Sequence, residues 1–70
     1  MEVGNSVVIT CSFKELVAIY IAEKDAEIIL NDVGVVKNIL YEGDSIEVYF
    51  PKISDIGGNY CFEPTMLKVV

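Results

Sequence analysis

Carboxylates and thiols are the groups in this 70-residue sequence that could take part in chemistry, because it contains no histidine and all five of its basic residues are lysines. Glu42 and Asp44 flank Gly43, and Asp55 follows in a later loop. These carboxylates lack the regular spacing of a calcium-binding loop. Nor does their spacing predict a pair held together for acid–base catalysis. We therefore expect solvated turn residues, and a protein that is not an enzyme.

Two cysteines, Cys11 and Cys61, are too few for a structural zinc site, which usually needs four cysteine or histidine ligands. They could form one disulfide if the strands that carry them are neighbours. The favoured alternative is a pair of ordinary buried thiols in a reducing compartment. The sequence predicts no metal and no other cofactor.

The net charge of −6 argues against nucleic acid as a partner, because phosphate backbones would be repelled. The lysines, at positions 14, 24, 37, 52 and 68, form no run that could make a basic patch. A charged partner would instead be basic. The simpler interpretation is that the acidic residues keep a small apolar domain soluble.

The length allows a single domain, residues 1–70, which could also be part of a larger protein. No apolar run approaches the roughly 18 residues of a membrane span. Met1 and Glu2 lead into a Gly-Asn turn without the basic stretch of a secretion signal. We expect a cytoplasmic protein without membrane insertion. The apolar fraction of 53% suggests that a partner or a neighbouring domain covers part of the surface.

Residues 34–50 predict an antiparallel hairpin. Two runs rich in Val, Ile, Leu, Tyr and Phe, 35–41 and 46–50, flank Gly43, which can adopt the positive φ of a tight turn. The first run is apolar on both faces, so either a bulge shifts its register or both faces are covered. The second run alternates, and its apolar members should face one side: Ile46, Val48 and Phe50.

Residues 13–22 are expected to form a helix. Ser12 and Glu15 make a capping box, in which each side chain satisfies a backbone donor of the other residue. Apolar residues then follow at helical spacing: Phe13, Leu16, Val17 and Tyr20. The alternative is a strand over residues 17–21, which are all β-compatible. A second short helix, 26–31, would be capped by Asp25 and would close one end of the domain.

Short strands at residues 6–10, 60–62 and 67–70 complete the pattern, with a loop of turn formers at 51–59 and one helical turn at 63–66. Together these segments predict a mostly β fold. The leading architecture is a partly open, SH3-like small barrel of about five strands, with a helical insertion between strands one and two. Its first and last strands would lie side by side, which hides two exposed edges.

Five short motifs recur in a recognisable order: a Val-Gly-x-x-Val-x-Ile start, a Ser-Phe-Lys-Glu-Leu helix, an Asp-Val-Gly-Val-Val strand, a Gly-Asp turn and a Gly-Gly…Tyr-Cys-Phe-Glu-Pro…Leu ending. In this order they resemble the SH3-like repeat domains of Mind bomb-type E3 ubiquitin ligases, over nearly the whole chain. Such repeats bind cytoplasmic tails of Notch-ligand substrates, while RING domains elsewhere transfer ubiquitin. The resemblance therefore implies a substrate-recognition module.

The resemblance carries over to Gly34 and Val36 in the second strand, to residues 43–44 in the turn, and to Phe62 and Pro64 near the end. Tyr60 stands where the family usually has tryptophan, and its Gly-His-Gly-x-Trp stretch has no counterpart at 21–24. A looser resemblance, in the Gly-x-Val strand and the Asn-aromatic…Leu-x-Val-Val ending, is to the SH3-like small subunit of photosystem I. That resemblance implies a structural or assembly subunit that docks in a larger complex.

Exposed aromatic rings beside a turn-rich loop are the best candidates for binding a protein or peptide segment. The predicted groove is lined by Tyr49, Tyr60, Lys52, Asp55, Gly57 and Gly58. Acidic rims at Glu42, Asp44 and Asp55 would favour a basic or neutral partner. In the simpler interpretation Tyr49 packs across strands on the outer face, and Gly57 and Gly58 form a plain turn. Tyr20 is expected in the core.

Overall fold

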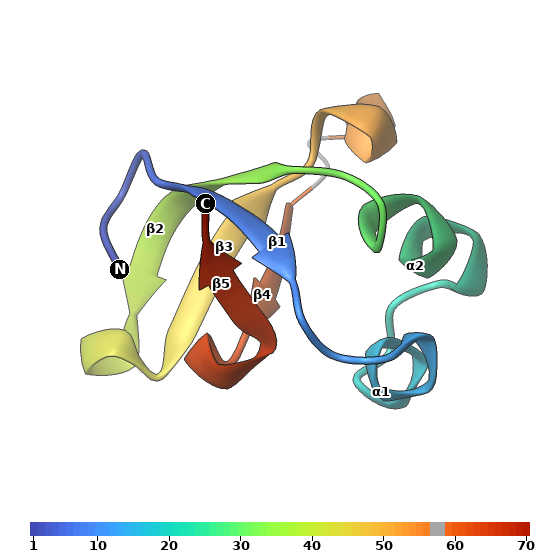
Figure 1. Cartoon of the computed structure of the whole chain (residues 1–70), viewed down its shortest axis with the longest axis horizontal. Coiled ribbons are helices and arrows are strands. Elements are labelled where there is room, and N and C mark those ends of the chain that lie inside the picture. Colours follow the sequence, from blue (N-terminus) through green and yellow to red (C-terminus); the bar gives the residue numbers. More distant parts are fainter. Residues whose placement is uncertain (57–58) are drawn as a thin grey trace.

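A computed structural model describes the backbone of residues 1–56 and 59–70, and shows an antiparallel sheet with two α-helices beside it (Figure 1). Its strands are β1 (Ser6–Ile9), β2 (Gly34–Leu40), β3 (Ser45–Tyr49), β4 (Asn59–Phe62) and β5 (Leu67–Val69). They lie in the order β4-β3-β2-β1-β5, and each neighbouring pair is antiparallel. The predicted five strands, mostly β fold and helical insertion between the first two strands are confirmed.

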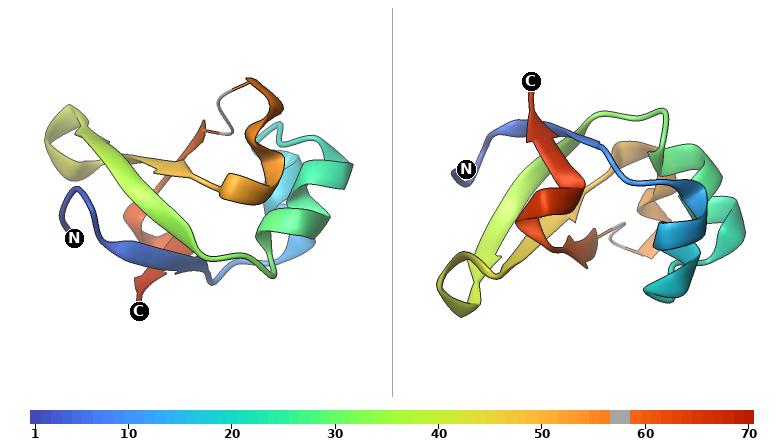
Figure 2. Two further views of the ribbon diagram at one scale, coloured as in Figure 1. Left: turned by 90° about the horizontal axis from the view of Figure 1, so that it is seen from above. Right: turned by 60° about the horizontal axis from the view of Figure 1, so that its bottom comes forward.

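The sheet is twisted but is not closed into a barrel (Figure 2). Strands β4 and β5 form the two opposite edges of the sheet, although they are consecutive in the sequence. Between them a 3₁₀ turn, Pro64–Met66, redirects the chain, so that β5 pairs with β1 and not with β4. The prediction that the first and last strands lie side by side is therefore confirmed, whereas barrel closure is not found.

The β2–β3 hairpin accounts for the mixed apolar pattern of its first strand. The register of the pairing shifts between Val36 and Asn38, so a bulge moves the apolar residues that follow onto a different face. At the tip, a 3₁₀ turn (Tyr41–Gly43) ends on Gly43 with a φ of 99°. Tyr41 precedes it at a φ of 51°, a conformation that residues with a Cβ rarely adopt. The tight turn at Gly43 is thus confirmed.

Helix α1 (Phe13–Ala18) begins at the predicted capping box. The Glu15 N–H donates to Ser12 Oγ at 3.2 Å, and the Ser12 N–H donates to Glu15 Oε1 at 3.3 Å. The helix ends earlier than predicted because Tyr20 takes a left-handed φ of 69°. The N–H groups of Tyr20 and Ile21 then donate to the carbonyls of Val17 and Leu16, at 3.0 and 3.2 Å. This is a Schellman motif with tyrosine in the place that glycine usually takes.

The second helix, α2 (Glu23–Ile29), starts three residues before the predicted position. Its N-cap is Ala22, which has no side-chain acceptor, so the prediction of Asp25 as the cap is wrong. Asp25 lies instead in the first turn, where a carboxylate favours the positive end of the helix. Ile29 is fully buried and closes one end of the core, but Ile28 is 36% exposed.

The core lies between the sheet and the helices, and its largest fully buried side chains come from both: Val7, Leu16, Ile29, Val36, Ile46, Val48 and Phe50. The Phe50 ring meets the Phe62 ring edge-on, with centroids 6.0 Å apart and planes at 84°. Phe50 also lies against the bare backbone of Gly34 on β2. The predicted alternation of β3, with Ile46, Val48 and Phe50 facing inward, is confirmed.

Candidate functional site

The two tyrosines predicted to share a groove lie on opposite faces of the sheet. Tyr60 is opposite Val48 in the β3–β4 ladder, and Val48 is fully buried, so Tyr60 points to the core face. Tyr49 is opposite Asn59 and points to the outer face. Directly opposed residues share a face and their neighbours take the other. The structure therefore does not bring Tyr49 and Tyr60 together.

Tyr49 is half-buried on the outer face, so the prediction that it is exposed is wrong. It pairs across the strands with Val35 and Asn59. The Nζ of Lys37 lies 5.4 Å from the centroid of its ring, close enough for a cation–π contact. This placement agrees with the simpler interpretation of cross-strand packing.

The other predicted groove residues are spread along the loop after β3. Lys52 is exposed, and its Nζ lies 4.0 Å from Asp32 Oδ1, at the limit of an ion pair. Asp55 belongs to the 3₁₀ turn Pro51–Ile56, but its side chain lies outside what the structure describes. Gly57 and Gly58 lie outside the described residues altogether. Glu42, which was predicted in the acidic rim, is exposed at the hairpin tip. It is not one of the residues that line the hollow described below.

Tyr60 connects the sheet to helix α2. Its hydroxyl donates a hydrogen bond to Asp25 Oδ2 at 2.6 Å. This hydrogen bond, together with burial and the charge of Asp25, raises the pKa of the Tyr60 phenol above its ordinary value. The neutral phenol is the form that the fold favours, because only it can donate to the carboxylate.

We expect the Tyr60–Asp25 bond to stabilise the protein up to about pH 10, the ordinary pKa of tyrosine, and to be lost as the pH rises through the higher pKa of the folded state. Ring NMR signals followed over an alkaline titration should show Tyr60 ionising at a higher pH in the native chain than in Asp25→Asn. An unchanged Tyr60 titration in Asp25→Asn would contradict this assignment.

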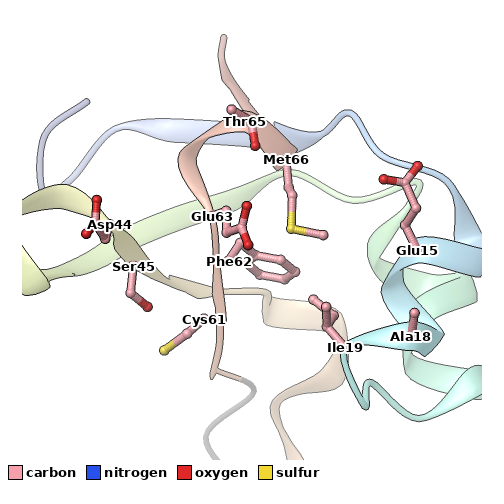
Figure 3. Close-up of a pocket in the computed structure, with 10 residues that line it drawn as sticks. All are labelled: Glu15, Ala18, Ile19, Asp44, Ser45, Cys61, Phe62, Glu63, Thr65 and Met66. Atoms are coloured by element: carbon pink, nitrogen blue, oxygen red, sulfur yellow. The ribbon is translucent and has the colours of Figure 1, made fainter.

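A hollow of about 410 Å³ lies beside strand β4 (Figure 3). Its lining comes from α1 and the residue after it, the hairpin end, β4 and the turn that follows: Glu15, Ala18, Ile19, Asp44, Ser45, Cys61, Phe62, Glu63, Thr65 and Met66. Three of these side chains are carboxylates and none of them is basic. The side chains of Ile19 and Met66 supply apolar surface between the carboxylates, next to the almost fully buried Phe62. The hollow thus suits an apolar group that carries a positive charge.

Tyr20 stands next to this hollow, beside its lining residue Ile19. The Tyr20 side chain is 96% exposed, and Ile19 is 40% exposed. The prediction of Tyr20 in the core is therefore wrong, because the left-handed turn at the end of α1 directs it outward. An exposed tyrosine that is held in an unfavourable backbone conformation is typical of a residue that contacts a partner.

Tyr20→Gly should raise the free energy of unfolding by about 0.5–1 kcal/mol, because glycine takes the left-handed conformation without strain and loses little packing here. Urea unfolding followed by circular dichroism measures the change. Tyr20→Ala is the matched control: it removes the ring but keeps the Cβ, so it should give no gain. Equal stability of the two variants would show that the backbone is not strained.

Both cysteines are free thiols, and the prediction that they are buried is wrong for Cys61. Cys11 is half-buried, and burial, followed by the nearby charge of Glu15, raises the pKa of its thiol. Cys61 is exposed and lines the hollow. Among the described residues no three His, Cys, Asp or Glu side chains gather closely enough to hold a metal ion.

No helix within residues 1–56 and 59–70 is long and apolar enough to cross a membrane. Comparison with known proteins gives no match to a family model, to a curated protein or to a solved structure.

Sequence reasoning found one part of the hollow and missed the rest. Asp44 was predicted as part of an acidic rim, whereas Glu15 was considered only as a capping residue. The signal that could have been used is the pair of carboxylates at the ends of the short elements, Glu15 on the capped helix and Glu63 just before Pro64. Their proximity depends on how α1 folds back towards β4, which no local pattern encodes.

Proposed function

We propose that this chain is a non-catalytic module that binds a protein segment carrying lysine or arginine, at the hollow beside β4. The observation that carries the proposal is the hollow itself, in which Glu15, Asp44 and Glu63 surround apolar surface without a basic residue in the lining. The net charge of −6 would add long-range attraction for a basic segment. Carboxylates arranged around an apolar surface can hold both the charged end and the aliphatic stem of a lysine side chain.

The resemblance to Mind bomb-type repeats, and with it the SH3-like description of the fold, stays a prediction. Under that resemblance the bound segment would belong to a substrate of a ubiquitin ligase. A cytoplasmic location stays a prediction as well. The hollow supports the binding role independently of the family, because the support comes only from the charge and the shape of its lining.

The test is a titration with a lysine-containing peptide, followed by amide chemical shifts of the isotope-labelled chain. We expect perturbations to cluster at Ile19, Cys61 and Glu63. The Glu63→Lys variant should weaken binding about tenfold, since one attractive contact becomes repulsive. Glu27→Lys is the matched control, because it makes the same charge change at an exposed residue of α2 that does not line the hollow.

Equal weakening by Glu63→Lys and Glu27→Lys would reduce the effect to net charge and would overturn the hollow as the site. The competing role, permanent docking as a structural subunit, is distinguished by sedimentation. Exposed apolar residues on the edge strand β5 favour it, with Val69 44% exposed and Val70 beyond it 65% exposed. A chain that stays monomeric at high concentration supports the transient module, and self-association supports docking.

A further inference from the structure

The direction of the backbone groups in β4 follows from hydrogen bonds at the other side of the sheet. The Val36 N–H donates to the Asn5 carbonyl at 2.9 Å, and the Val36 carbonyl accepts from the Gly4 N–H at 2.8 Å. The peptide groups of Val36 therefore face the chain leading into β1. Because these groups alternate along a strand, those of Val35 face β3. Val35 is opposite Tyr49, so the two exchange hydrogen bonds.

The same alternation can be continued across β3. Since the N–H and C=O of Tyr49 face β2, those of Val48 face β4 and bond to Tyr60, which is opposite Val48. The groups of the next residues on β4, Asn59 and Cys61, must then point away from β3. They lie on the free edge of the sheet, where β4 has no further strand neighbour in the described sheet.

Strand β4 has few of the features that usually protect a sheet edge. Edge strands are commonly blocked by lysine, proline or a bulge. Asn59–Phe62 contains no lysine or proline, and its ladder with β3 runs without a register shift. The opposite edge, β5, carries the exposed Lys68. An additional strand would therefore be accepted more readily at β4.

The hollow lies along this unprotected edge. Cys61 is one of its lining residues, and the peptide groups of Cys61 point to this free edge. In Figure 3, Asp44, Ser45 and Cys61 lie on one side of β4, whereas Phe62, Met66 and Ile19 lie on the other. An extended segment paired with β4 would place alternate side chains on these two sides.

We infer that the segment bound at the hollow joins the sheet as a further strand on β4, with its main chain bonded to Cys61 and its side chains alternating between basic and aliphatic. This inference rests on the proposed function. The aliphatic side chains contact Met66 and Ile19, and the basic ones lie on the side of Cys61 and reach Asp44. Backbone pairing gives affinity, and the alternation gives specificity.

The probe is a ten-residue peptide of alternating valine and lysine with both ends blocked. Its counterpart is the same peptide methylated on two adjacent central nitrogens, so that one donor is removed from each edge. Methylation should raise the Kd about fivefold, because the one donor that faces β4 is lost and a ladder bond contributes on the order of 1 kcal/mol. The unmodified peptide should also slow hydrogen exchange at the Cys61 amide, with the Tyr60 amide, already bonded to β3, as the internal reference.

The outcomes separate the two proposals. If the unmodified peptide binds, the methylated one is weakened and the Cys61 amide becomes protected, strand addition is supported. If both peptides bind equally and Cys61 exchange is unchanged, strand addition is overturned, while binding at the hollow stands. If neither peptide binds, both proposals are overturned.

Discussion

Phe50→Ala should remove about 3–5 kcal/mol from the free energy of unfolding, because it empties the centre of the core. The Phe50 ring is fully buried and packs edge-on against Phe62. A chain of 70 residues has a total stability on the order of 4–10 kcal/mol. Phe50→Ala therefore removes a large share of the stability, and the midpoint of thermal unfolding followed by circular dichroism should fall by more than about 10 °C.

Phe13→Ala is the control for Phe50→Ala, since it removes the same side chain from a half-buried place on α1. Phe13→Ala should lower the free energy of unfolding clearly less than Phe50→Ala does, because it removes less buried apolar surface and creates a smaller cavity. A loss for Phe50→Ala no greater than that for Phe13→Ala would mean that Phe50 is not the centre of the core.

Gly34→Ala is expected to destabilise the protein by about 1–3 kcal/mol, although alanine usually suits a strand better than glycine does. A Cβ at residue 34 would come within 2.8 Å of Phe50 Cε1 and would collide with the Cγ1 of Val48. Neither side chain can move away easily, because both are fully buried. Urea unfolding of the variant and the native chain measures the cost.

The Val48→Ala background provides a sharper version of this experiment. Removing the Val48 methyl groups makes room for the Cβ at residue 34, so Gly34→Ala should cost less there than in the native chain. A coupling energy of about 1 kcal/mol or more between the two changes is expected for residues in direct contact. Purely additive effects would show that the close packing of Gly34 does not determine its cost.

The features predicted correctly from the sequence are those encoded by residues near one another. The Ser12–Glu15 capping box, the positive φ of Gly43 and the alternation of β3 each depend on a few neighbouring residues. The bulge in β2 was one of two interpretations of a mixed pattern, and only the pairing register could decide between them.

The features that were missed depend on distant parts of the chain. Tyr20 was expected to continue a helix, but Ile21 is buried and its N–H donates to the Leu16 carbonyl, which favours a turn at that point, and the turn directs Tyr20 to solvent. The predicted groove failed because the faces of Tyr49 and Tyr60 are fixed by the register between β3 and β4. The hollow combines four separate segments, so no single stretch of sequence predicts it.

The pairing of β5 with β1 has a consequence for the order in which the chain folds. It joins Leu67 to Ile9, near opposite ends of the sequence, whereas the β2–β3 hairpin joins residues close along the chain. Long loops close late in folding because their entropy is lost before their contacts are gained. We expect substitutions in the hairpin mainly to slow refolding and substitutions at Leu67 mainly to accelerate unfolding, as stopped-flow kinetics can establish. The pairing of the last residues of the chain with β1 would then determine the unfolding rate, and with it the lifetime of the folded state.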